Sequence, residues 1–157
     1  MTVIVLSLLI GVVAGLRTMT APAAAAFAAR FGALAVAGTP MAFMGYAWTP
    51  WILGVAALAE LVTDQLPSTP SRKVPVQFTA RILSGALSGA TVAAPSASVV
   101  TGLIAGIIGA ILGTLGGAAF RARLAAAFGS DRPAAIVEDL IALGGAALIV
   151  TAPSILA

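Results

Sequence analysis

The chain of 157 residues contains no cysteine and no histidine. The missing cysteines exclude disulfides and thiolate chemistry, and the two absences together remove the commonest ligands of a zinc site. Without histidine, no side chain titrates near neutral pH unless its surroundings perturb it strongly. We therefore expect no cofactor and no enzyme of the histidine- or cysteine-dependent classes.

Charged residues are also scarce, at 8% of the chain, whereas hydrophobic residues make up 61%. Soluble domains carry about 25% charged residues, and so few charges would not cover the surface of a soluble fold of this size. A surface that faces lipid needs none. The composition therefore predicts a single all-α transmembrane domain over residues 1–157, with membrane lipid as its surroundings.

Five apolar segments predict transmembrane helices, at about residues 3–29, 51–66, 76–94, 99–120 and 134–152. The first exceeds the roughly 20 residues that a span needs, so we expect a tilt, a kink at Pro22 or a partly re-entrant end. Residues 33–49 are apolar but rich in glycine and proline, and they are open to three interpretations: a span, a re-entrant segment or a surface segment. Tyr46, Trp48 and Trp51 are typical of an aromatic belt at a membrane interface.

The basic residues predict an orientation. With five spans, most of them fall on one side of the membrane, namely Arg72, Lys73, Arg121, Arg123 and Arg132. The first two belong to the one clearly polar loop, residues 67–75. The positive-inside rule then places the N-terminus in the cytoplasm. A single Arg-Lys pair is too small a basic patch for nucleic acid, so no nucleic-acid partner is expected.

Glycines recur at four-residue spacing in three of the expected spans. They are Gly11 and Gly15; Gly85 and Gly89; Gly102 and Gly106; and Gly109, Gly113 and Gly117. This spacing places small residues on one helix face and lets two backbones approach closely. Two interpretations carry equal weight: packing within one subunit, and a seam between subunits of a homo-oligomer.

An internal repeat is suggested by two pairs of similar stretches. Residues 10–15 resemble residues 108–113, and residues 56–61 resemble residues 134–139. An offset of three spans reverses direction across the membrane, so we expect an inverted repeat of residues 1–67 and 98–157 joined by a connector helix at 76–94. Many transporters are built on this plan.

Charged residues inside the expected spans are the most informative feature of the sequence. They are Arg17, Glu60, Asp64, Arg81, Glu138 and Asp139. A charge at the centre of a bilayer costs about 2.5 to 3.5 kcal/mol on insertion scales, so such residues persist when they face a partner or water. One interpretation is a buried ion-pair network that fixes helix register, with Arg121 and Arg123 as further members. The other is a substrate or ion site, for which Glu60 and Glu138 are the leading candidates.

The stretch from Arg17 to Thr20, followed by Pro22, also has two interpretations. It could interrupt the helix and free backbone groups to bind a ligand. Alternatively, Thr18 and Thr20 could bond back to the helix around a proline kink. We favour the kink.

Several of these residues lie in motifs that resemble a known family. GLRT at residues 15–18, ELVTDQLPSTPS at 60–71, Arg81 with Gly85-Ala86-Leu87, and VEDLIAL at 137–143 are similar to a family of small bacterial membrane proteins, the domain of unknown function 4126. The resemblance implies a place in the bacterial inner membrane and carries no established reaction. The chain departs from the family pattern after Asp64, where Gln65-Leu66-Pro67 replaces Lys-Ile-Pro or a similar tripeptide.

The charges and the expected repeat favour a small transporter or channel for an ion or small solute. The alternative is a non-transporting membrane scaffold or partner subunit held together by its ion pairs. An intramembrane enzyme ranks third, because no serine lies in a Gly-x-Ser-x-Gly elbow. Carboxylate ligation of Mg²⁺ or Mn²⁺ is chemically open to the four acids, but the sequence leaves the presence of a metal undecided.

Overall fold

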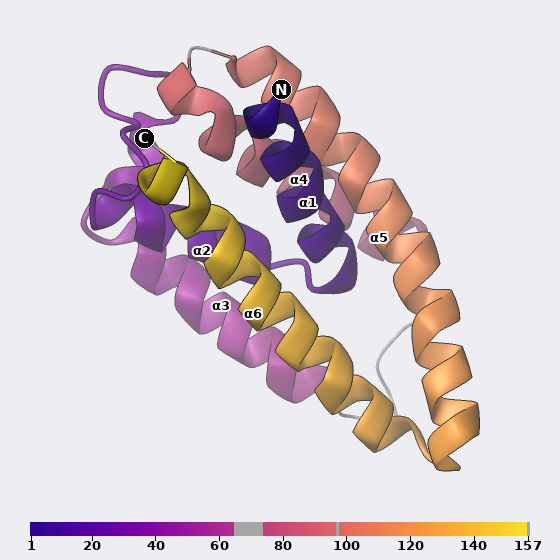
Figure 1. Cartoon of the computed structure of the whole chain (residues 1–157). Coiled ribbons are helices and arrows are strands. Elements are labelled where there is room, and N and C mark those ends of the chain that lie inside the picture. The colour runs from indigo at the N-terminus through magenta and orange to yellow at the C-terminus, as the bar shows by residue number, and fades with distance from the viewer. Residues whose placement is uncertain (65–73, 97, 157) are drawn as a thin grey trace.

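The computed structural model describes residues 1–64, 74–96 and 98–156, with side chains to residue 152. The described residues form helices and no strands, so the all-α prediction is confirmed. Six α-helices follow along the chain (Figure 1): α1 (Thr2–Leu16), α2 (Thr20–Arg30), α3 (Thr49–Thr63), α4 (Pro75–Ala93), α5 (Val99–Phe128) and α6 (Asp131–Leu156). Most of the polar loop expected at 67–75 lies outside the described residues.

The ends of the helices follow from proline and glycine in the sequence. Pro50, Pro75 and Pro133 each lie in the first turn of a helix, where the missing N–H would have no partner within the helix. Gly129 ends α5 in the left-handed conformation, with a φ of 69° that favours glycine. The chain then turns at once into α6, so these two long helices form a hairpin.

Helices α1, α4 and α5 pack closely through their glycines. A Cβ atom added at Gly11, Gly85, Gly102 or Gly109 would come closer than 3.0 Å to an atom of a facing helix. Ser7 adds a buried hydrogen bond of 3.1 Å from its hydroxyl to the Gly89 carbonyl. The glycine faces therefore serve packing within one chain. Homo-oligomerisation stays a prediction, and it would have to use another surface.

The first expected span is a helical hairpin instead of one continuous helix. Helix α1 ends at Leu16, α2 begins at Thr20, and Arg17 between them has an extended backbone, with φ −137° and ψ 115°. In Figure 1 the chain turns back after α1, and α2 runs toward the end of the molecule where α1 began. The proline kink that we favoured is therefore wrong, because Pro22 lies within the first turn of α2.

The six helices alternate in direction along the chain. Arg81 of α4 binds the Gly15 carbonyl at the end of α1, while Ser7 near its start binds Gly89, so α1 and α4 are antiparallel. Arg17 contacts Asp139 and Val13 faces Gly145, so α6 is also antiparallel to α1. Both ends of the chain consequently lie at the same end of the molecule (Figure 1). Five spans would have placed them at opposite ends.

Two of the described helices, α5 and α6, are long and apolar enough to cross a membrane, which is fewer than the five expected. The first segment fails because it breaks into helices of 15 and 11 residues. Helix α3 is apolar but has 15 residues, and α4 has 19 residues that include Arg81 and several polar side chains.

The ambiguous residues 33–49 do not form a span. They contain one short 3-10 turn, η1 (Ala42–Gly45), and they fold back over α2. Leu34, Val36 and Met44 of this segment are buried, whereas Tyr46 and Trp48 are exposed. The segment therefore forms a cap on one end of the helices, and its aromatic residues face outward.

The directions of the helices also bear on the expected inverted repeat. Gly11 faces Gly106 and Gly15 faces Ala110, so α1 and α5 run in the same direction. An inverted repeat of residues 1–67 and 98–157 requires these two helices to run in opposite directions. The repeat stays a prediction from the sequence, and these helix directions do not support it.

Candidate functional site

The tip of the α1–α2 hairpin is the centre of the candidate site. A helix leaves its last carbonyls and its first N–H groups without partners inside the helix. At this tip, the end of α1 and the start of α2 are separated by only three residues, Arg17 to Met19. The tip therefore presents free acceptors and free donors side by side in the interior of the chain.

Glu60, in the last turn of α3, binds the free donors. Its two carboxylate oxygens accept hydrogen bonds from the backbone N–H groups of Thr18 and Met19, at 2.6 and 2.7 Å. These N–H groups lie at the start of α2, where the helix dipole is positive and a carboxylate is stabilised. Glu60 thus acts as an N-terminal cap supplied from another helix.

Arg81, in α4, binds the free acceptors. Its Nη1 donates to the carbonyl oxygens of Gly15 and Leu16, at 2.9 and 2.8 Å. A cation is favourable here because the end of α1 is the negative end of its dipole. Arg81 Nη2 also lies 4.0 Å from a carboxylate oxygen of Glu60. The two caps have opposite charges and connect the hairpin tip to α3 and α4.

Arg17 itself is buried and contacts three carboxylates. Its Nε donates to Asp139 at 2.5 Å and its Nη1 pairs with Asp64. Its Nη2 lies 3.9 Å from Glu138 and has no hydrogen-bond acceptor among the described residues. The side chains of Asp64 and Asp139 keep 15% and 16% of their surface exposed, so the cluster opens outward on that side.

Arg121, in α5, extends the cluster to the surface. Its Nη1 lies 3.4 Å from the buried Glu138, and its Nε and Nη2 bind Asp131 at 2.9 and 2.6 Å. Asp131 is at the rim, because 62% of its side chain is exposed. All five acidic residues of the chain therefore contact at least one of Arg17, Arg81 and Arg121.

The structure brings all six candidate residues together, namely Arg17, Glu60, Asp64, Arg81, Glu138 and Asp139. The pairing expected between acids of two segments and arginines of three others is found. Arg123 departs from it, since it is exposed and makes no ion pair with the described residues. No group of three acidic side chains among the described residues is placed to hold a metal ion.

Sequence reasoning missed the backbone groups of the site. The N–H groups of Thr18 and Met19 became ligands of Glu60, and the Thr18 carbonyl accepts a hydrogen bond from the buried Ser84 hydroxyl. The available signal is the stretch from Arg17 to Thr20, where a helix interruption is the alternative to the proline kink.

Comparison with known proteins gives a family but no reaction. Neither the curated proteins nor the solved structures include a match to this chain. The sequence model of one family, described as a domain of unknown function (DUF4126), matches residues 4–157 and thus nearly the whole chain. The motifs that gave the resemblance include all six charged residues that meet at the hairpin tip. The chain belongs to this DUF4126 family.

Proposed function

We propose that the protein is embedded in a membrane, because large apolar side chains lie on its surface and small or polar residues fill its interior. Its buried residues are mostly alanine, glycine, serine, threonine and charged groups, whereas many leucine, isoleucine and valine side chains are exposed. Exposed apolar patches of this extent mark interaction surfaces in soluble proteins, whereas lipid accepts them freely. Examples of outward residues are Ile52, Val55, Leu58 and Val62 on α3, and Ile104, Ile108, Leu112 and Leu115 on α5.

In this proposal both termini lie outside the cytoplasm of a bacterial inner membrane. Arg121, Arg123 and Arg132 lie near the turn between α5 and α6, whereas among the described residues Arg30, at the end of α2, is the one basic side chain toward the other end of the molecule. The positive-inside rule assigns the richer end to the cytoplasm. The N-terminus lies away from that end because α1 and α2 form a hairpin, so this orientation is opposite to the one inferred from five spans.

Within the membrane, the geometry best supports transport of protons or a small cation. The observation that carries this proposal is the cluster at the hairpin tip, where Arg17 contacts the three carboxylates of Asp64, Glu138 and Asp139. Carboxylates that gather this closely favour the binding of a proton or a cation. Arg17 Nη2 lies 3.9 Å from Glu138 but makes no hydrogen bond with any residue that the structure describes. Because buried donors are nearly always satisfied, this free donor supports a site that also accepts a ligand.

The cluster also offers a mechanism for coupling. Asp64 and Asp139 are its partly exposed members, and both bind Arg17 at the hairpin tip. A proton or cation that neutralises one of them removes part of the attraction that holds the tip. Binding would then favour a conformation with the tip displaced, because a ligand shifts an equilibrium by its difference in affinity for the two states.

Flux through purified protein in liposomes tests this proposal. Under a potassium diffusion potential, an enclosed pH-sensitive dye reports proton entry, and a sodium-sensitive dye reports sodium entry. Wild-type protein should conduct one of these ions well above protein-free liposomes. Asp64→Asn and Asp139→Asn should lower that flux at least tenfold, while Arg123→Gln, at an exposed position outside the cluster, should leave it unchanged. Equal flux in wild-type and empty liposomes for both ions would contradict the proposal.

A second function is a non-transporting membrane scaffold or partner subunit. The observation that favours it is that every acidic side chain is paired with an arginine. Each of the five acids contacts an arginine, and Glu60 also caps α2, which is what a purely structural network requires. For a scaffold, the same two Asn variants should lower thermal stability in detergent, and neither they nor wild-type protein should conduct either ion. The flux and the melting temperature together separate the two functions.

A further inference from the structure

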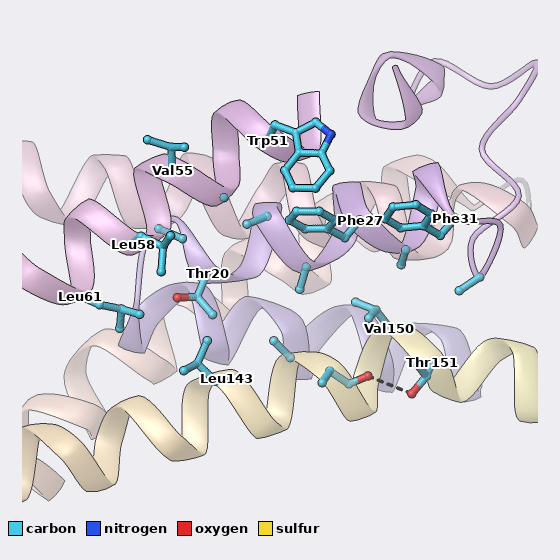
Figure 2. A pocket seen from close by; sticks show the side chains of 18 residues that line it. Thr20, Phe27, Phe31, Trp51, Val55, Leu58, Leu61, Leu143, Val150 and Thr151 are labelled. Atoms are coloured by element: carbon cyan, nitrogen blue, oxygen red, sulfur yellow. Dashed lines mark hydrogen bonds between the residues drawn. The ribbon is translucent and has the colours of Figure 1, made fainter. Parts of the chain in front are cut away.

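A groove runs along the outer side of α2, between α3 and α6 (Figure 2). It encloses about 640 Å³ and is lined almost entirely by apolar side chains. Phe27, Phe31 and Trp51 line one end. The rings of Phe27 and Trp51 are packed edge to face, with their centroids 5.4 Å apart. Leu61 and Leu143 lie toward the other end, next to the acidic residues of the hairpin tip. The groove therefore leads from an aromatic end toward the charge cluster.

One polar atom in this groove lacks a partner. Thr20, the first residue of α2, is 3% exposed, and its Oγ1 makes no hydrogen bond with any described residue. In Figure 2 its hydroxyl points into the space between α3 and α6, toward the end lined by Leu61. Buried hydroxyl groups are nearly always hydrogen-bonded. A ligand in the groove that carries an acceptor at this end would satisfy the hydroxyl.

The length and volume of the groove suit a single extended chain. From Thr20 to Phe31 the groove follows α2 for about 16 Å, at 1.5 Å per residue. The volume of the groove, about 640 Å³, falls within the range of about 300–1,000 Å³ for sites that hold single small molecules. An extended alkyl chain fits both this length and this volume, and it matches the apolar lining.

We propose that this groove binds one acyl chain of a membrane phospholipid, and that Thr20 donates a hydrogen bond to the ester carbonyl of the chain. The inference rests on the membrane location proposed above and is independent of transport. The apolar chain lies along the alanines of α2 and reaches the aromatic end at Phe27 and Trp51. The lipid head group then lies beside the charge cluster, and the chain holds α2, α3 and α6 at a fixed spacing.

Quenching of Trp51 fluorescence by a brominated lipid tests this site. The chain has two tryptophans, and replacing the exposed Trp48 with phenylalanine leaves Trp51 as the sole reporter. Phosphatidylcholine with dibrominated acyl chains is added to this single-tryptophan protein in detergent micelles. A specific site gives quenching that saturates with lipid, whereas collision with lipid in the micelle gives quenching that rises without saturation.

Matched variants assign the saturable quenching to the groove. Thr20→Val removes the hydroxyl and should weaken lipid binding severalfold, while Thr20→Ser keeps the hydroxyl and should bind nearly as the parent does. Ala147→Leu fills the groove and should abolish saturation, whereas Ala119→Leu, on an exposed part of α5 away from the groove, should not. Each variant is also checked for an unchanged melting temperature, so that loss of folding is not read as loss of lipid.

Three results would overturn the proposal. Quenching that never saturates would mean that no lipid site exists. Saturation that Thr20→Val leaves unchanged would remove the assigned role of the hydroxyl. A dimer that Ala147→Leu dissociates would mean that a second copy occupies the groove. None of these results depends on ion flux, because the variants leave every charged residue in place.

Discussion

Glu60 and Asp131 are both acidic residues of the same cluster, but their surroundings differ. Glu60 accepts two backbone hydrogen bonds at the start of α2, whereas Asp131 pairs with Arg121 at an exposed rim. We expect Glu60→Gln to cost about 2 kcal/mol, because hydrogen bonds to a charged group contribute about 1.5–3 kcal/mol. Asp131→Asn should cost about 0–1 kcal/mol, as exposed ion pairs do. Melting temperatures of the two variants in detergent test this prediction. We expect the larger decrease for Glu60→Gln, and equal decreases in both variants would contradict it.

At the residue scale, the sequence predicted which side chains gather but not all of what they bind. Arg17, Arg81 and the intramembrane acids were identifiable because charges in apolar segments are costly and must find partners. The bonds from Thr18 and Met19 to Glu60 join backbone atoms to a side chain 42 and 41 positions away. Backbone groups have no residue type that marks them, so only the folded chain shows this use.

At the scale of helices, two glycines of α5 differ in how closely a neighbouring helix approaches them, namely Gly106 and Gly116. A Cβ at Gly106 would come closer than 3.0 Å to the backbone of α4, whereas a Cβ at Gly116 meets nothing within 4 Å. Gly106→Ala should therefore destabilise the protein by about 1–3 kcal/mol through overpacking. Gly116→Ala should stabilise it by up to about 1 kcal/mol, because alanine has the higher helix propensity. Thermal unfolding of the two variants should shift in opposite directions, and shifts of the same sign would contradict this packing.

The α1–α2 hairpin is the element that the sequence did not predict, whereas α3 to α6 fall close to the expected segments. Residues 3–29 are apolar almost throughout, and the break is marked only by the stretch from Arg17 to Thr20 with Pro22 after it, which is equally compatible with a kink. The hairpin depends on distant groups, because Glu60 and Arg81 satisfy the backbone atoms that the break exposes. A local sequence pattern contains no information about such partners, and a continuous helix was the simpler expectation.

At the scale of the whole molecule, the hairpin reverses the predicted orientation of the N-terminus. A continuous first span would place Thr2 on the same side of the membrane as Ser130, which lies between α5 and α6. The hairpin instead places Thr2 on the side of Ala37, in the segment that connects α2 to α3. The side of each residue is therefore a direct test of how α1 and α2 are arranged.

Labelling of single cysteines with a membrane-impermeant maleimide in intact cells makes this measurement, and the natural chain offers a clean background because it has no cysteine. Thr2, Ala37 and Ser130 are all exposed, so each can be replaced by cysteine without opening the interior. We expect Thr2→Cys and Ala37→Cys to be labelled from outside, and Ser130→Cys to be labelled only after the cells are permeabilised. Labelling of Thr2→Cys together with Ser130→Cys, and apart from Ala37→Cys, would contradict the hairpin and the charge cluster built at its tip.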